Sequence, residues 1–140
     1  MSFLTYRQWD AIADAYIPLL ALSCVFFLAN NIWKKQFKLS ARLALATMIS
    51  IVYVYGWMYV DLALSLWPKL EWDYSTHTAL AWTLVISNVF LKKAIRIPVL
   101  ISMGLYLGLM RYQNYHTWED MISTTVVIAP FSYWLFKRLK

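Results

Sequence analysis

The chain has 140 residues, of which 61% are hydrophobic, 18% aromatic and 14% charged, and its formal net charge is +6 at pH 7. Soluble globular domains carry about 45–50% apolar residues, so this composition excludes an ordinary soluble domain and predicts an integral membrane protein. The basic residues form short clusters between apolar stretches, which is typical of a membrane topology signal and argues against a nucleic-acid partner.

Apolar segments recur along the whole chain, and a membrane-spanning helix takes about 20 residues. In chain order the segments cover residues 15–33, 42–67, 77–91, 97–110 and 121–136. The third and fourth are short, so we expect polar residues to extend them or neighbouring helices to bury them. The short loops leave no room for a soluble domain. The sequence therefore predicts an all-α, polytopic bundle of five transmembrane helices that forms a single domain over residues 1–140.

Charge divides between the two sides of this predicted bundle. All seven acidic residues and both histidines fall on one side, and ten of the thirteen Lys and Arg residues fall on the other. The positive-inside rule assigns the basic side to the cytoplasm. We therefore expect an external N-terminus, a cytoplasmic C-terminus and insertion in the plasma (inner) membrane. The ten basic residues are Lys34, Lys35, Lys38, Arg42, Lys92, Lys93, Arg96, Lys137, Arg138 and Lys140.

Several residues near the expected outer boundary have structural interpretations. Asp61 is expected to pair with Arg7 or Lys69, and the alternative is that it enters the pocket described below. Gly104 and Gly108 lie four residues apart, a spacing that lets another helix approach closely, and simple packing is sufficient to explain them.

Aromatic residues gather at the expected outer boundary, where we expect most of them to form an interfacial belt. They are Trp67, Trp72, Tyr74, Tyr112, Tyr115 and Trp118.

Two short loops on the acidic side, residues 68–77 and 111–120, carry the polar chemistry. Because the third and fourth segments form a hairpin between them, both loops should return to the same face, where His77 and His116 can share a pocket. His116 and Asp120 are four residues apart, so in a helical start to the fifth segment they lie on one side of the helix. A carboxylate in that position can hold the imidazole tautomer, which is the geometry of an oriented nucleophile or base.

The same loops contain groups that suit an anion. Ser75 and Thr76 precede the third segment and can cap it, which leaves backbone N–H donors at a helix N-terminus for an anion such as phosphate. Arg111 would add a fixed positive charge to that site, and Lys69 is a second candidate.

The pattern Ser75-x-His77, followed by Arg111 and then His116-x-x-x-Asp120, resembles the type 2 phosphatidic acid phosphatase superfamily and the related sphingomyelin synthases. The family pattern is Lys-x6-Arg-Pro, then Pro-Ser-Gly-His, then Ser-Arg-x5-His-x3-Asp, and the resemblance covers the second to fifth segments. It implies that His116 is a nucleophile forming a phosphohistidine, that Asp120 orients it, and that His77 is the general acid. It also implies that Arg111 binds phosphate and that neither a cofactor nor a metal is required.

The chain departs from the family pattern at defined positions. Its second motif has Tyr74 and Thr76 where the family has Pro and Gly, and its third motif has four residues rather than five between Arg and His. Lys35 and Arg42 have the spacing of the first motif, but they lie on the predicted cytoplasmic side. Lys69 is the only lysine in the place where that motif belongs.

The sequence thus predicts an integral membrane lipid phosphatase or phosphotransferase that acts at the outer leaflet on a lipid phosphate or polyprenyl diphosphate. The acceptor, water or an alcohol, and the oligomeric state stay open. The competing interpretation is a non-catalytic carrier or membrane assembly protein that binds a lipid phosphate without cleaving it. A zinc site formed by His77, His116 and Asp120 is a further alternative, although an arginine at the site suits an anion better than a cation.

Overall fold

The computed structural model describes residues 5–140, and it is all-helical, as predicted. No β-strand occurs within that range. The short helical turns η1 (Pro68–Leu70) and η2 (Lys93–Ile95) lie in two of the loops. The five α-helices are α1 (Tyr6–Trp33), α2 (Phe37–Leu64), α3 (Thr76–Leu91), α4 (Arg96–Tyr112) and α5 (Trp118–Leu139).

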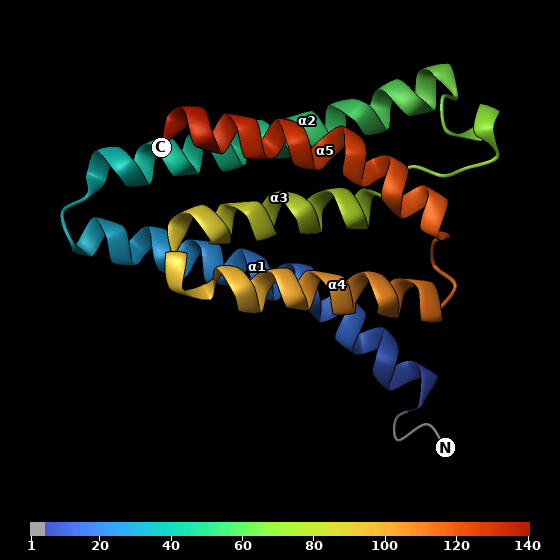
Figure 1. Ribbon diagram of the computed structural model, residues 1–140, viewed down its shortest axis with the longest axis horizontal. Helices are drawn as coiled ribbons and strands as arrows, with labels where there is room; N and C mark the ends of the chain where they lie inside the picture. The colour runs from blue at the N-terminus through green and yellow to red at the C-terminus, as the bar shows by residue number, and fades with distance from the viewer. Residues whose placement is uncertain (1–4) are drawn as a thin grey trace.

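Helix α3 is the centre of the bundle. Among the described helices it alone packs against each of the other four, and Figure 1 shows it between the α2–α5 pair and the α1–α4 pair. Eleven of its 16 residues are buried. The expectation that this short segment is buried among its neighbours is therefore confirmed, and its interior position explains why it does not need the length of a lipid-facing helix.

In the part of the chain that the structure describes, three segments are long and apolar enough to cross a membrane: Tyr6–Trp33, Phe37–Leu64 and Lys93–Tyr112. Many large apolar side chains on them point outward, such as Leu22, Phe26 and Val52, which are 64–69% exposed. In water such a surface would be unfavourable, whereas hydrocarbon accepts it. The apolar helices are thus compatible with a multi-pass membrane protein.

The first two helices have different limits from those expected. Helix α1 begins at Tyr6, nine residues before the predicted apolar segment, and the backbone N–H of Thr5 donates to Oε1 of Gln8 at 2.8 Å in the first turn. Helix α2 ends at Leu64, because Ser65 takes a left-handed conformation with φ of 51°. The chain therefore leaves the helix before Trp67.

This early end changes the role of two aromatic residues. Trp67 and Tyr74 are each only 6% exposed, and their ring centroids lie 5.0 Å apart. Nε1 of Trp67 donates to Oγ of Ser123 at 2.8 Å, and the Tyr74 hydroxyl donates to the carbonyl oxygen of Val54 at 2.9 Å. The predicted interfacial role is wrong for these two residues, because their polar atoms find partners inside the protein.

A polar cluster joins α1 to α3 within the apolar bundle. Asn88 is fully buried, and its Oδ1 accepts a hydrogen bond of 2.7 Å from Oγ of Ser23. Its Nδ2 donates to the carbonyl oxygens of Leu20 at 3.1 Å and Leu84 at 2.9 Å. A buried amide is stable only when its donors and acceptors are satisfied, so these bonds fix the position of α1 along α3.

Replacing this amide should therefore loosen the α1–α3 contact. We expect Asn88→Ala to lower the free energy of unfolding by roughly 1–3 kcal/mol, since it removes the hydrogen bonds to the Ser23 hydroxyl and the Leu20 carbonyl on α1. Thermal unfolding in detergent micelles measures the change. Asn31→Ala is the matched control, because Asn31 is only half-buried and makes no side-chain hydrogen bond within residues 5–140. An Asn88 variant as stable as this control would contradict the assignment.

Candidate functional site

The two histidine-bearing loops meet at one end of the bundle. The connection between α2 and α3 and the connection between α4 and α5 lie together at the right of Figure 1. The backbone N–H of Asp73, in the first loop, donates to Oδ1 of Asp120, at the start of α5, over 2.8 Å. The prediction that the α3–α4 hairpin returns both loops to one face is confirmed.

Asp120 is the residue that joins these loops. It is 6% exposed, and its second oxygen, Oδ2, accepts the N–H of Thr117 at 2.8 Å. The Thr117 hydroxyl in turn accepts the N–H of Asp120 at 3.2 Å, so the pair forms a capping box at the N-terminus of α5. Two backbone donors stabilise the buried carboxylate, and a helix N-terminus favours its negative charge.

His116 lies against this carboxylate but not on the same helix. Helix α5 starts at Trp118, so the expected helical spacing of His116 and Asp120 is wrong, although the two side chains do meet. Nδ1 of His116 is 3.8 Å from Oδ2 of Asp120 and also 3.8 Å from Oδ2 of Asp73. Both distances exceed hydrogen-bond range, and within residues 5–140 the buried Nδ1 has no hydrogen-bond partner. The imidazole therefore faces two carboxylates without a hydrogen bond to either.

Burial dominates the protonation of His116. The side chain is 12% exposed, and this desolvation lowers its pKa below the ordinary value of 6.5. The charges of Asp73 and Asp120 oppose the shift, and the neighbouring His77 adds to it. Since the net shift is downward, the His116 imidazole is neutral at pH 7. Asp73 had been given no role on sequence grounds, because nothing in its spacing indicated that it would face His116.

His77 lies beside this group in the first turn of α3. Its side chain is exposed and lines a small cavity of about 30 Å³ together with residues of α1, α4 and the α4–α5 loop. Those residues are Ala13, Asp14, Tyr106, Met110 and Tyr115. The structure thus brings His77, His116 and Asp120 to one region.

Helix α1 contributes to the region in a way that sequence reasoning missed. The Tyr115 hydroxyl donates to Oδ1 of Asp10, and Asp14 lines the cavity beside His77. Asp10 and Asp14 are four residues apart, which places both on one helix face and is the only sequence signal that they lie at the same region.

Ser75 caps α3, as predicted. Its Oγ accepts the N–H of Thr78 at 3.2 Å and donates to Oγ1 of Thr78 at 2.8 Å, while its own N–H donates to Oγ1 of Thr124 at 3.1 Å. The residue is fully buried, so its hydroxyl is committed to the fold. Thr76 is the first residue of the helix and is partly exposed.

The predicted cations do not lie against the histidines. Nη1 of Arg111 donates to Oδ1 of Asn114 at 2.9 Å, within its own loop, and Lys69 is exposed on η1. Within residues 5–140 neither side chain forms a hydrogen bond or ion pair with His77, His116 or Asp120.

Asp61 also differs from expectation. Its Oδ1 accepts the backbone N–H of Trp67 at 2.8 Å, and the residue is only 9% exposed. It makes no ion pair with Arg7 or Lys69 in the described chain. The carboxylate is used instead to fix the turn after α2, because that turn has backbone donors that no helix satisfies.

The region does not resemble a metal centre. Across residues 5–140, no three His, Cys, Asp or Glu side chains are arranged to hold a metal ion, so His77, His116 and Asp120 do not form the zinc site considered above. Both oxygens of Asp120 are occupied by backbone N–H groups. What the arrangement offers is a neutral imidazole with carboxylates at one nitrogen and a second imidazole nearby.

No protein-family model, curated protein or solved structure matches the chain. The resemblance to the type 2 phosphatidic acid phosphatases is therefore carried by the motif residues alone.

The joining role of Asp120 predicts a local change in hydrogen exchange. In Asp120→Ala the amides of Asp73 and Thr117 lose their acceptor, and since a hydrogen bond to a charged group is worth roughly 1.5–3 kcal/mol, their exchange should accelerate by about tenfold or more. Exchange measured in detergent by mass spectrometry or NMR tests this.

Two internal references make the result specific. The Ser75 amide, bonded to Thr124, should stay protected in Asp120→Ala, and Glu119→Ala should leave all three amides unchanged because Glu119 is exposed. Uniform loss of protection, or none, would show that Asp120 does not hold the two loops together.

Proposed function

We propose that this chain is an integral membrane enzyme that removes or transfers a phosphate group on a lipid, with His116 as the nucleophile. The observation that carries the proposal is the neutral, nearly buried His116 imidazole, whose Nδ1 faces two carboxylates beside His77 at one end of an apolar helical bundle. Lipid phosphates and polyprenyl diphosphates are the substrate classes that match this setting.

The imidazole geometry supports nucleophilic catalysis. A proton on Nδ1, favoured by the two carboxylates, leaves the lone pair on Nε2 at the opposite side of the ring. In the proposed first step Nε2 attacks phosphorus, the bond from phosphorus to the lipid oxygen breaks, and that oxygen takes a proton from His77. The ring becomes cationic in the phosphohistidine, and Asp73 and Asp120 stabilise that charge.

In the second step water attacks phosphorus and gives its proton to His77, the phosphorus–nitrogen bond breaks, and phosphate leaves with His116 regenerated. An alcohol in place of water would transfer the phosphate to another molecule. One nucleophile therefore serves hydrolysis and transfer, and the acceptor that reaches His116 decides between them.

Phosphate binding requires further groups, which we assign to the loops. Arg111 is exposed, and its guanidinium would give up its hydrogen bond to Asn114 and donate two hydrogen bonds to phosphate instead. Lys69 would add a second charge. Ser75 holds the start of α3 so that the backbone N–H groups of Thr76 and His77 remain available to an anion at a helix N-terminus.

We also propose that the helices cross the plasma (inner) membrane five times, with the histidine loops outside. The charge distribution supports this orientation: the end opposite the histidines carries the α1–α2 and α3–α4 connections and the C-terminus, where the basic residues concentrate. With only short loops at the histidine end, the site would lie at headgroup depth, and its substrate would arrive from the bilayer.

A non-catalytic carrier or assembly protein remains the second candidate. The observation in its favour is the distance of cationic groups from His116: Arg111 is bonded to Asn114, and the cavity at His77 is only about 30 Å³. A protein of this kind would hold a lipid phosphate near the imidazoles and never cleave it.

Phosphate release separates these candidates. With dioleoyl phosphatidic acid or a polyprenyl diphosphate in detergent, we expect the wild type to release phosphate with or without chelator. His116→Ala should abolish release, and His77→Ala should lower the rate by roughly 10²–10⁴-fold, as expected for loss of a general acid. Glu119→Ala is the control with unchanged activity. Lipid binding without release would support the carrier, and loss on chelation would support a metal enzyme.

The lowered pKa of His116 predicts the acid limb of the pH–rate profile. Only the neutral imidazole attacks phosphorus, so the rate should fall as pH decreases through a midpoint below 6.5. Asp73→Asn removes a charge that raises this pKa, so the midpoint should move to a lower pH than in the wild type. The backbone bond from Asp73 to Asp120 is retained in this variant. A midpoint that stays fixed or rises would contradict the assignment.

The orientation is tested by labelling introduced cysteines with a membrane-impermeant maleimide in intact cells. Glu71→Cys should react directly, and Lys93→Cys should react only after permeabilisation, because the two exposed positions lie at opposite ends of the bundle. The unaltered chain is the control, since its only cysteine, Cys24, is buried. The reverse pattern would place the histidines in the cytoplasm.

A further inference from the structure

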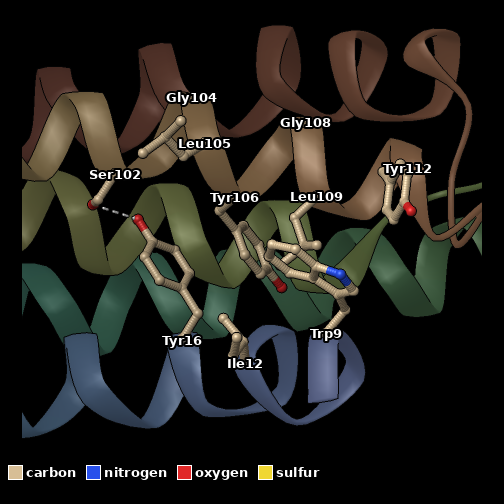
Figure 2. A pocket seen from close by; sticks show the side chains of 10 residues that line it. All are labelled: Trp9, Ile12, Tyr16, Ser102, Gly104, Leu105, Tyr106, Gly108, Leu109 and Tyr112. Atoms are coloured by element: carbon tan, nitrogen blue, oxygen red, sulfur yellow. Dashed lines mark hydrogen bonds between the residues drawn. The ribbon is translucent and has the colours of Figure 1, made fainter. Parts of the chain in front are cut away.

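An apolar groove opens between the first half of α1 and α4. Figure 2 shows Trp9 and Tyr16 on α1 facing Tyr106 and Leu109 on α4, with Gly104 and Gly108 on the same stretch of α4. The cavity measures about 670 Å³ and its lining is almost wholly apolar. This size lies within the roughly 300–1,000 Å³ of small-molecule pockets.

The two glycines are what keep the groove open. A Cβ atom built on Gly104 or Gly108 would meet nothing within 4 Å, so no other helix of the described chain packs against them. The expectation that they serve close packing within the bundle is wrong for this reason. Larger side chains at these positions would occupy the groove without disturbing a neighbour.

The groove adjoins the histidine region through one residue. Tyr106 lines both the groove and the small cavity that contains His77. It stacks on Tyr16 with ring centroids 4.3 Å apart, and the Tyr16 hydroxyl is bonded to Oγ of Ser102 at 2.9 Å. The apolar groove and the small cavity at His77 are therefore adjacent, with Tyr106 lining both.

A polar atom in the groove lacks a partner. Nε1 of Trp9 is buried and has no hydrogen-bond acceptor within residues 5–140, whereas a buried indole N–H ordinarily finds one. An occupant with an oxygen atom near its polar end would supply that acceptor.

We propose that the groove binds the hydrocarbon chain of the lipid whose phosphate reacts at His116, an inference that rests on the proposed function. A lipid phosphate is apolar along its length and polar at one end, which matches a groove that ends beside His77. Its linkage oxygen would accept from Trp9. A second transmembrane helix would fill the groove but would leave its junction with the histidine cavity unexplained.

Filling the groove tests the proposal. The measured quantity is the ratio of phosphate release from dioleoyl phosphatidic acid to release from water-soluble dibutanoyl phosphatidic acid. In Gly108→Leu or Gly104→Leu this ratio should fall at least tenfold, because the long chain loses its binding space. Gly56→Leu is the matched control: Gly56 lies on α2, a Cβ there also meets nothing within 4 Å, and the ratio should not change. An unchanged ratio in the α4 variants would overturn the proposal.

A binding measurement separates this proposal from the catalytic one. Phosphatidic acid with a photoreactive diazirine in its acyl chain should label residues 9–16 and 102–112 of the wild type, and Gly108→Leu should lose that labelling. Labelling in the groove without phosphate release would reject the enzyme and keep the lipid groove. Release without labelling there would reject the groove alone. A dimer that Gly108→Leu converts to a monomer, with no labelling, would show that a second copy occupies the groove.

Discussion

The Asp120 carboxylate holds together two loops that are far apart in the chain. Its oxygens accept one N–H from each loop, and the residues of the longer-range bond, Asp73 and Asp120, are 47 positions apart. A buried carboxylate is costly unless such donors compensate for lost water, so the loops and the start of α5 stabilise one another. His116 lies between these partners, and His77 follows directly from the loop that Asp73 belongs to. The proximity of the two imidazoles therefore depends on Asp120.

The bundle around this junction is closely packed at α3 and leaves a groove between α1 and α4. Helix α3 is buried by its four neighbours. Hydrogen bonds join Asn88 of α3 to α1, and they join Ser75 and Trp67, in the loop before α3, to α5. The first half of α1 lies beside α4 with the groove between them (Figure 2). Such a division would suit the proposed enzyme, in which the reacting groups must be held in place and a lipid must arrive from the hydrocarbon.

The electrostatics of the site favour a neutral His116 imidazole, and the nearby cations do not form an anion-binding pocket around it. Desolvation of His116 outweighs its two carboxylate neighbours, while Arg111 and Lys69 stay at the surface. Within the proposed mechanism, the positive charge that phosphate requires would have to come from these exposed side chains and from the start of α3. That arrangement connects catalysis to substrate arrival: the cations would move inward only when a phosphate is there to attract them.

Sequence alone determined the helical class, the position of α3 and α4 within a residue or two, and the meeting of the two histidine loops at one end, because hydrophobic segment length and alternating topology are local properties. The tertiary structure decided what each polar group touches. Asp73 faces His116, Arg111 turns to Asn114, Asp61 fixes the turn before Trp67, and the glycines of α4 border a groove instead of a helix. These outcomes depend on where each helix ends and on which group is close enough to pair with each buried donor or acceptor. Contacts between residues distant in the chain set the helix ends and these pairings.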